Sequence, residues 1–206
     1  MTTNTVEGLI LDSLMPDFDV ALAEHLVVSA DPATTWRSAR ELDLLTVHST
    51  LLDAAMWIRG LPARLVGRSV PVPPRLVIAN GGLPGWLVLG ESGHEIAFGA
   101  VGRFWRPIIT WRDVTRADFA GFDEPGWGKI AANFTVTPYG RRTLLTYECR
   151  TATTDSVARR RFRRYWWVVR PFVAHIMRAT LRTIKTDAEG HAERGAYGRI
   201  AAAFRQ

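Results

Sequence analysis

The last third of the chain contains one long segment in which apolar residues recur at helical spacing. Between Asp155 and Glu189 an apolar stripe runs through positions 162, 165, 166, 169, 172, 173, 176, 177, 181 and 184, with Thr180 in the same row. This spacing predicts a single amphipathic helix of roughly 50 Å, at about 1.5 Å per residue. Pro171 removes one helical hydrogen bond and predicts a bend. An apolar stripe this long must be buried against another layer of the fold.

The middle of the chain changes to a period of two, which is typical of strands. Short turns containing glycine or proline separate most of these segments, and such turns join antiparallel neighbours. A longer connection lies between Pro107 and Gly128. The predicted strands are Arg75–Asn80, Trp86–Glu91, Glu95–Arg106, Lys129–Thr137 and Arg142–Thr151.

Upstream of these strands the pattern predicts one strand and two helices. His25–Ala30 is a short apolar run that is typical of a strand. Asp31 and Pro32 follow it, and because Asp is a good N-cap and Pro suits the first helical position, a helix is expected from there to about Leu44. A second helix is expected over Ser49–Arg59, where Gly60 and Pro62 end it.

These elements predict an α+β fold in which a curved antiparallel sheet of about six or seven strands wraps on the long C-terminal helix. The 206 residues, 47% of them hydrophobic, suit one domain. We assign this domain to residues 20–189. Residues 1–19 are expected to form a lead-in, with a short helix near Leu9–Met15, and residues 190–206 a C-terminal tail.

The composition argues against several classes of protein. No apolar run reaches the roughly 18–20 residues of a membrane helix. The N-terminus has no basic residue before its apolar patch, unlike a signal peptide. Cys149 is the only cysteine, so neither an internal disulfide nor a thiolate zinc site is expected, and a cytoplasmic location follows. The five histidines have no metal-ligand spacing, and no nucleophile elbow or phosphate loop occurs, so we expect no metal and no cofactor.

Three stretches resemble the START-like superfamily, also called the SRPBCC or polyketide cyclase-like helix-grip superfamily. They are Glu24–Trp36 (EHLVVSADPATTW), Trp86–Pro107 (WLVLGESGHEIAFGAVGRFWRP) and Thr146–Pro171 (TYECRTATTDSVARRRFRRYWWVVRP). The resemblance covers roughly residues 17–189. The second and third stretches look like an uncharacterised bacterial branch of the superfamily. It implies a cavity under the last helix that holds a lipid, sterol, polyketide, hormone or aromatic compound. Some members are cyclases or dehydratases, but no catalytic motif carries over to this chain.

The residue pattern also predicts a pocket, independently of the resemblance. The inward faces of two strands are large at their ends and small in the middle, which can leave space for an apolar ligand. Tight filling by the aromatic residues of the helix is the alternative. The predicted lining is Ile96, Phe98, Ala100, Gly102, Phe104, Ala132, Phe134, Tyr147, Phe162, Tyr165, Trp166 and Val169.

Few polar groups are expected inside this pocket. Tyr147 and Tyr165 are the candidates for acid–base chemistry, because a phenol can point inward and donate a hydrogen bond; a purely structural role is the alternative. Arg103, Glu148 and Arg150 alternate to the other face of their strands and are expected to be solvated.

The C-terminal part of the chain is strongly basic. Residues 141–206 carry 15 basic and 5 acidic side chains, against 11 and 15 in residues 1–140. Helical geometry places Arg160, Arg164 and Trp167 opposite the buried stripe, and Arg178, Arg182 and Lys185 are expected on the same outer side. Such a surface can bind an anionic membrane or nucleic acid. The absence of a nucleic-acid-binding motif favours a solvated helix face.

Three functions remain open at this point. The first is binding of a hydrophobic or amphipathic small molecule between sheet and helix. The second is a cyclase or dehydratase activity in the same cavity. The third is an interaction or regulatory role of the basic outer face.

Overall fold

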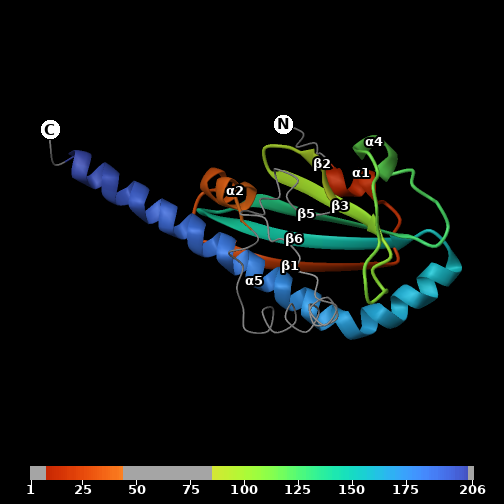
Figure 1. The fold of residues 1–206 in the computed structure, drawn as a ribbon. Helices are drawn as coiled ribbons and strands as arrows, with labels where there is room; N and C mark the ends of the chain where they lie inside the picture. Colours follow the sequence, from red (N-terminus) through yellow and green to blue (C-terminus); the bar gives the residue numbers. More distant parts are fainter. Residues whose placement is uncertain (1–7, 44–84, 204–206) are drawn as a thin grey trace, which may run out of the picture.

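A computed structural model describes residues 8–43 and 85–203, with side chains up to residue 195. The predicted helix 49–59 and the predicted strand 75–80 lie outside these residues. The described fold is built on an antiparallel sheet, and a long helix crosses one face of it (Figure 1).

Six strands form the sheet, which confirms the predicted α+β class. The order is β1-β6-β5-β3-β2, and a short strand β4 pairs with β3. All pairs are antiparallel. The strands are β1 (Val20–Val28), β2 (Trp86–Glu91), β3 (Glu95–Gly102), β4 (Trp111–Arg112), β5 (Gly128–Tyr139) and β6 (Arg142–Thr153).

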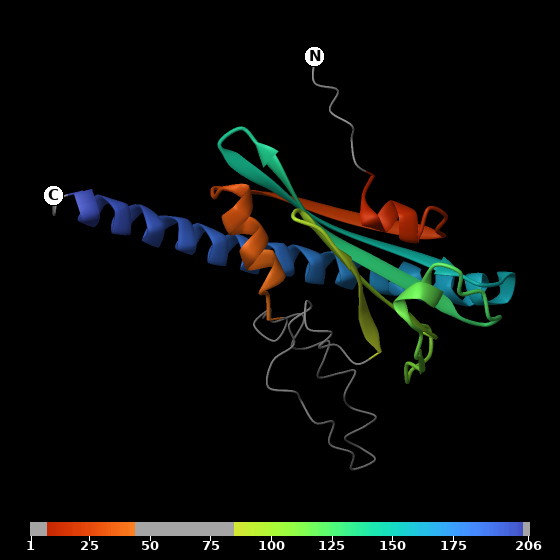
Figure 2. The same cartoon turned by 90° about the horizontal axis from the view of Figure 1, so that it is seen from above.

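Four helices accompany the sheet in the described residues, namely α1 (Ile10–Leu14), α2 (Pro32–Arg40), α4 (Arg116–Phe119) and α5 (Ser156–Ala203). The long helix α5 was predicted to end at Glu189, but it continues without a break to Ala203. Its last turns project beyond the sheet, as the views from the side and from above both show (Figures 1 and 2).

Aspartates begin two of the helices as the sequence predicts. Asp31 accepts a hydrogen bond from the backbone N–H of Thr34 at 3.0 Å, and Pro32 follows as the first residue of α2. At the start of α5 the carboxylate of Asp155 accepts from the N–H groups of Val157 and Ala158. These bonds lower the pKa of Asp155, Ala158 having the largest effect.

Two strand boundaries differ from the prediction for physical reasons. The first strand begins at Val20 rather than His25, because β1 pairs along its whole length with β6, from Val20–Thr151 to Val28–Thr143. The strand β3 ends at Gly102 rather than Arg106, because the chain turns there: the N–H of Arg103 donates to the carbonyl of Thr110 at 2.9 Å. The β5–β6 connection turns at Gly140, whose φ of 62° suits glycine.

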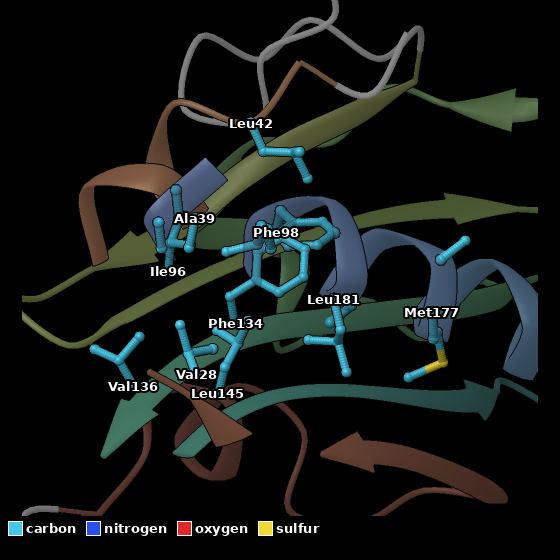
Figure 3. Packing of buried hydrophobic residues seen from close by; sticks show 14 of the residues in the cluster. Val28, Ala39, Leu42, Ile96, Phe98, Phe134, Val136, Leu145, Met177 and Leu181 are labelled. Carbon is cyan, nitrogen blue, oxygen red and sulfur yellow. The ribbon is translucent and has the colours of Figure 1, made fainter. Parts of the chain in front are cut away.

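The main hydrophobic core lies between the sheet and the middle of α5. Met177, Leu181 and Ile184 of α5 are almost fully buried and share one cluster with Phe134 and Leu145 of the sheet. Figure 3 shows Met177 and Leu181 directed toward the sheet, with Phe98 and Phe134 beside Leu181 and with Ala39 of α2 nearby. The predicted apolar stripe is therefore buried in this middle part of α5.

The first half of α5 is less buried than predicted. Phe162 is 2% exposed, but Phe172, which was assigned to the buried stripe, is 41% exposed. Tyr165, Trp166 and Val169 are only partly buried. Figure 1 shows that α5 bends in its first half, and Pro171 is the residue that interrupts its hydrogen bonding. A stripe assigned on a straight helix changes its position relative to the sheet when the helix bends.

A second hydrophobic core covers the opposite face of the sheet, and the sequence analysis missed it. Leu11 and Met15 of the N-terminal segment are buried there against Leu89, Val101 and other residues of the sheet, together with Phe119 of α4. The short helix predicted near Leu9–Met15 exists, but it is packed against the sheet instead of forming a loose lead-in. The signal was present in β3, where every residue is buried: Ala97, Gly99 and Val101 are as apolar as the other face, which is typical of a strand covered on both sides.

Buried polar groups fix the N-terminal segment on this face. The carboxylate of Glu95, which is 1% exposed, accepts from the N–H of Ile10 at 2.6 Å, from the N–H of Leu11 at 3.1 Å and from Nδ2 of Asn133 at 2.7 Å. Arg150 donates to Asp12 at 2.6 Å and to the carbonyl of Met15 at 3.2 Å.

Arg150 and its neighbours are therefore not the solvated groups that the sequence predicted. Arg150 is 9% exposed and also donates to Glu148 at 2.6 Å. Arg103 lies 4.3 Å from the centre of the Trp127 ring and donates to the carbonyl of Gly126. The period of two placed these residues on the correct face, but the N-terminal segment and the loop before β5 cover that face.

Replacing Glu95 by Gln tests this polar contact. Three donors point at the carboxylate, so an amide in its place puts an N–H group against a buried donor. We expect Glu95→Gln to lower the free energy of unfolding by about 2 kcal/mol. The control is Glu91→Gln at the partly exposed pair with Arg40, where the loss is expected below about 1 kcal/mol. Urea denaturation of both variants measures the difference, and equal losses would contradict the assignment.

Candidate functional site

Aromatic rings form a continuous chain across the face of the sheet that α5 covers. Phe134 contacts Tyr147 at 4.5 Å between ring centres, and Phe98 lies against both rings, at 5.6 and 6.2 Å. From Phe98 the contacts continue through Trp86, Trp111, Phe104, Trp105 and Phe162 to Tyr165 and Trp166. This chain of aromatic rings therefore joins the buried core to the first half of α5.

The predicted pocket residues fall into two groups along this chain. Ile96, Phe98, Ala132 and Phe134 belong to the main core, with Tyr147 packed against it. Phe162 stacks on Trp166 at 5.8 Å and lies 6.3 Å from Tyr165, in the first turns of α5. Trp105 and Trp111, which the prediction did not include, connect the two groups. Ala100 is fully buried and Val169 is partly buried.

Two glycines accommodate the ring of Phe104 where β3 and β5 pair. Gly102 and Gly128 are register partners, and a Cβ on either residue would lie 2.9 or 3.1 Å from that ring. A Cβ on Gly102 would also lie 3.0 Å from the ring of Trp111. The space next to Gly102, predicted as part of the cavity floor, is therefore occupied by the chain's own aromatic rings.

A groove lies between the edge strand β1 and the first half of α5, and we call it the β1–α5 groove. Its volume is about 1050 Å³. Leu22 contributes to its wall on the sheet side, and Trp166, Pro171 and Ala174 contribute on the helix side. The complete lining is Asp19, Val20, Ala21, Leu22, Glu24, Arg159, Arg163, Trp166, Trp167, Arg170, Pro171, Ala174 and Arg178.

The groove leads toward the aromatic chain. In the β1–β6 register Leu22 pairs with Cys149 and Glu24 with Tyr147, so Tyr147 lies one strand inward from the groove wall. Leu22, Ile130 and Tyr147 all keep part of their surface exposed although they belong to the covered side of the sheet. Of the twelve predicted lining residues, Trp166 is the one that lines this groove.

Burial controls the ionisation of the two titratable groups next to the groove wall. It raises the pKa of the Tyr147 phenol well above its usual range, and Cys149 adds to this effect. Burial also raises the pKa of the Cys149 thiol to about 12. Both groups are therefore neutral at physiological pH. Tyr147 can donate a hydrogen bond to a ligand, but it is not a phenolate base.

The basic face predicted on α5 is only partly found. Arg160 and Arg164 are exposed, as expected. Trp167 is also exposed, at 83%, but it lines the β1–α5 groove as well. Arg178 and Lys185 turn instead toward β1: Arg178 pairs with Glu24 at 2.8 Å, and Lys185 donates to the carbonyl of Val27 at 2.8 Å. They are on the β1 side because the edge strand has backbone and carboxylate groups that no other strand pairs.

Neither a metal cluster nor a membrane helix is found in the described part of the chain. Among the residues that the structure describes, no three His, Cys, Asp or Glu side chains are grouped so that they could hold a metal ion. Nor does any helix in those ranges have the length and apolarity needed to cross a bilayer.

Comparisons with known proteins give a fold likeness and no family. No family model and no curated protein matches the chain. Among solved structures, the di-domain aromatase/cyclase StfQ of the steffimycin biosynthetic pathway is 15% identical with a TM-score of 0.43, and the match covers 89% of this chain and 55% of that one. The protein TTHA0849 of Thermus thermophilus is 10% identical over 84% and 99% of the two chains, with a TM-score of 0.31.

A third match is the Zhui aromatase/cyclase of a Streptomyces species, which is 13% identical over 82% and 93% of the two chains at a TM-score of 0.28. This chain thus spans about half the length of StfQ. Scores at this level carry no argument about the ligand or the reaction. The START-like assignment therefore remains a prediction from the sequence.

The groove was not predicted, because its residues come together only after folding. Its sheet wall is β1, whose start was placed too late along the chain. Asp19, Arg159 and Arg163 become groove residues only when α5 lies beside that edge. Alternation within Val20–Val28 was the available signal, since it puts Val20, Leu22 and Glu24 on one face.

Substitution of Gly102 tests whether the space beside it is filled. A leucine there must displace the rings of Phe104 and Trp111, so we expect Gly102→Leu to cost about 1–3 kcal/mol of unfolding free energy. Gly93→Leu is the control, because a Cβ on Gly93 meets nothing within 4 Å. Thermal denaturation of both variants is the measurement. Unchanged or increased stability of Gly102→Leu would show that an empty cavity lies there.

Charge reversal on the outer face of α5 tests the interaction hypothesis. Arg160 and Arg164 are exposed, so the double variant Arg160→Glu/Arg164→Glu is expected to change the unfolding free energy by less than about 1 kcal/mol. We also expect the parent protein not to bind DNA, RNA or anionic vesicles at physiological salt. Salt-dependent binding by the parent, lost in the variant, would establish the third function instead.

Proposed function

We propose that this protein binds a hydrophobic or amphipathic small molecule, of lipid, polyketide or aromatic type, between the sheet and α5, with the β1–α5 groove as the place of entry. The groove itself carries the proposal. It has a ligand-sized volume of about 1050 Å³, and it places the apolar side chains of Val20, Leu22 and Trp166 beside six charged side chains. Apolar surface of this kind can hold the body of a small molecule, and the polar groups can orient it.

The aromatic chain supports binding of a ligand with a flat or extended apolar body. Trp166 lies at the groove and stacks on Phe162, which contacts Trp105. Aromatic side chains offer large apolar surface at low conformational cost. Burying apolar ligand surface is worth about 25 cal/mol per Å², so a few hundred Å² support micromolar affinity after the cost of association.

The chemistry of the groove, and of the two titratable groups on the strand next to its wall, favours binding over catalysis. Tyr147 stays protonated, so it serves as a hydrogen-bond donor and not as a general base. Cys149 likewise stays a neutral thiol. A cyclase or dehydratase activity would need an acid–base pair at the bound ligand. The two carboxylates that line the groove, Asp19 and Glu24, are already paired, with Arg159 at 2.5 Å and with Arg178 at 2.8 Å.

Binding of an apolar fluorescent probe tests the proposal. N-phenyl-1-naphthylamine is expected to bind the parent protein at micromolar concentration and to gain fluorescence. Leu22→Gln puts a polar group on the groove wall and should weaken binding about tenfold, which corresponds to roughly 1.4 kcal/mol. Ala23→Gln is the control, since Ala23 is exposed on the other face of β1.

Circular dichroism melting keeps this test independent of folding. Both variants should retain the parent spectrum, because Leu22 is only partly buried. No probe binding by the parent protein, or equal weakening by both substitutions, would contradict the proposed site. Mass spectrometry of small molecules that purify with the protein then identifies the natural ligand.

A further inference from the structure

The arginines of the β1–α5 groove differ in their partners. Arg159 pairs with Asp19 at 2.5 Å, and Arg178 pairs with Glu24 at 2.8 Å. Both carboxylates that line the groove are thus occupied. Arg163 and Arg170 also line it, and neither has a carboxylate within ion-pairing distance among the residues that the structure describes.

The two remaining cations lie on one side of α5. They are seven residues apart, which is close to two helical turns and about 10 Å along the axis. Trp166 and Trp167 lie between them in the sequence and line the same groove. Two arginine side chains at this separation can reach one polar ligand group from opposite sides, with the indole of a tryptophan beside it.

This arrangement selects a class of ligand. With four arginines and two carboxylates the groove carries a net positive charge next to an apolar wall. A neutral hydrophobic ligand makes no use of that charge, whereas a carboxylate or phosphate accepts two hydrogen bonds from one guanidinium. Charge-assisted hydrogen bonds of this kind are shorter and stronger than those between neutral groups.

We propose that the ligand is an amphiphile with an anionic head group, a carboxylate or a phosphate, which Arg163 and Arg170 bind at the groove while the apolar body lies along Leu22 and Trp166. This inference rests on the proposed function and adds the charge of the ligand to it. Arg159 and Arg178 hold the two walls of the groove together through their ion pairs, so that Arg163 and Arg170 stay available.

Matched ligands that differ only in the head group test the charge. Isothermal titration calorimetry compares decanoate, decyl phosphate and decanol below their aggregation concentrations. The parent protein is expected to bind at least one of the two anions about tenfold more tightly than decanol. The two anions together show whether the site prefers a carboxylate or a phosphate.

Two double variants locate the charge selection. Arg163→Gln/Arg170→Gln should bind the preferred anion about tenfold more weakly, so that its preference for the anion over decanol is lost. Arg160→Gln/Arg164→Gln removes the same charge from the outer face of the helix and should keep the preference of the parent protein. Circular dichroism confirms that both variants are folded.

The other possible results distinguish a failure of the anionic head group from a failure of apolar ligand binding itself. Equal binding of decanol and both anions, or a preference that persists in Arg163→Gln/Arg170→Gln, overturns the anionic head group and leaves apolar ligand binding intact. Failure of all three amphiphiles and of N-phenyl-1-naphthylamine overturns both proposals. Binding of anionic phospholipid vesicles without binding of any monomeric amphiphile would overturn the groove as a small-molecule site and assign the charge to a membrane surface.

Discussion

The fold depends on burying one face of α5 against one face of the antiparallel sheet. Met177, Leu181 and Ile184 provide the apolar surface on the helix, and Phe134 and Leu145 provide it on the sheet. Since burial of a large apolar side chain contributes about 1.5–3 kcal/mol, this interface is the main source of stability in the described fold. The helix α2 packs at one end of the same core, where Ala39 is buried.

The first half of α5 is less buried and forms one wall of the β1–α5 groove. Pro171 bends the helix, and before the bend Tyr165, Trp166 and Val169 remain partly exposed instead of sealing the core. The same half carries Arg159 and Arg163 along the edge strand. One continuous helix thus packs on the core through Met177, Leu181 and Ile184 and forms one wall of a polar–apolar groove through residues from Arg159 to Arg178. A ligand can occupy the groove without opening the main core.

On the opposite face of the sheet, a few buried polar groups fix the N-terminal segment. Glu95 receives two N–H groups of the N-terminal segment, and Arg150 binds the side chain of Asp12 and the carbonyl of Met15. These bonds replace the water that the buried groups have lost. Oδ1 of Asn133 is buried there without a hydrogen-bond partner in the described part of the chain. The N-terminal segment is therefore a structural part of the domain.

The sequence by itself determined the antiparallel sheet, the order of β1, β2, β3, β5 and β6 along the chain, and the long helix, because hydrophobic periodicity and capping residues such as Asp31 and Asp155 act locally. It did not predict β4 or α4, which lie in the longer connection between Pro107 and Gly128. It also placed Phe98, Phe134 and Tyr147 together on one face. Only the tertiary structure decided where that face is filled and where it stays open. Phe104 folds over Gly102 after the chain turns, and Arg178 reaches Glu24 across 154 residues of sequence. Such contacts depend on the bend of α5, the edge strand β1 and the turn after β3. The local sequence pattern does not determine how these elements are placed relative to one another.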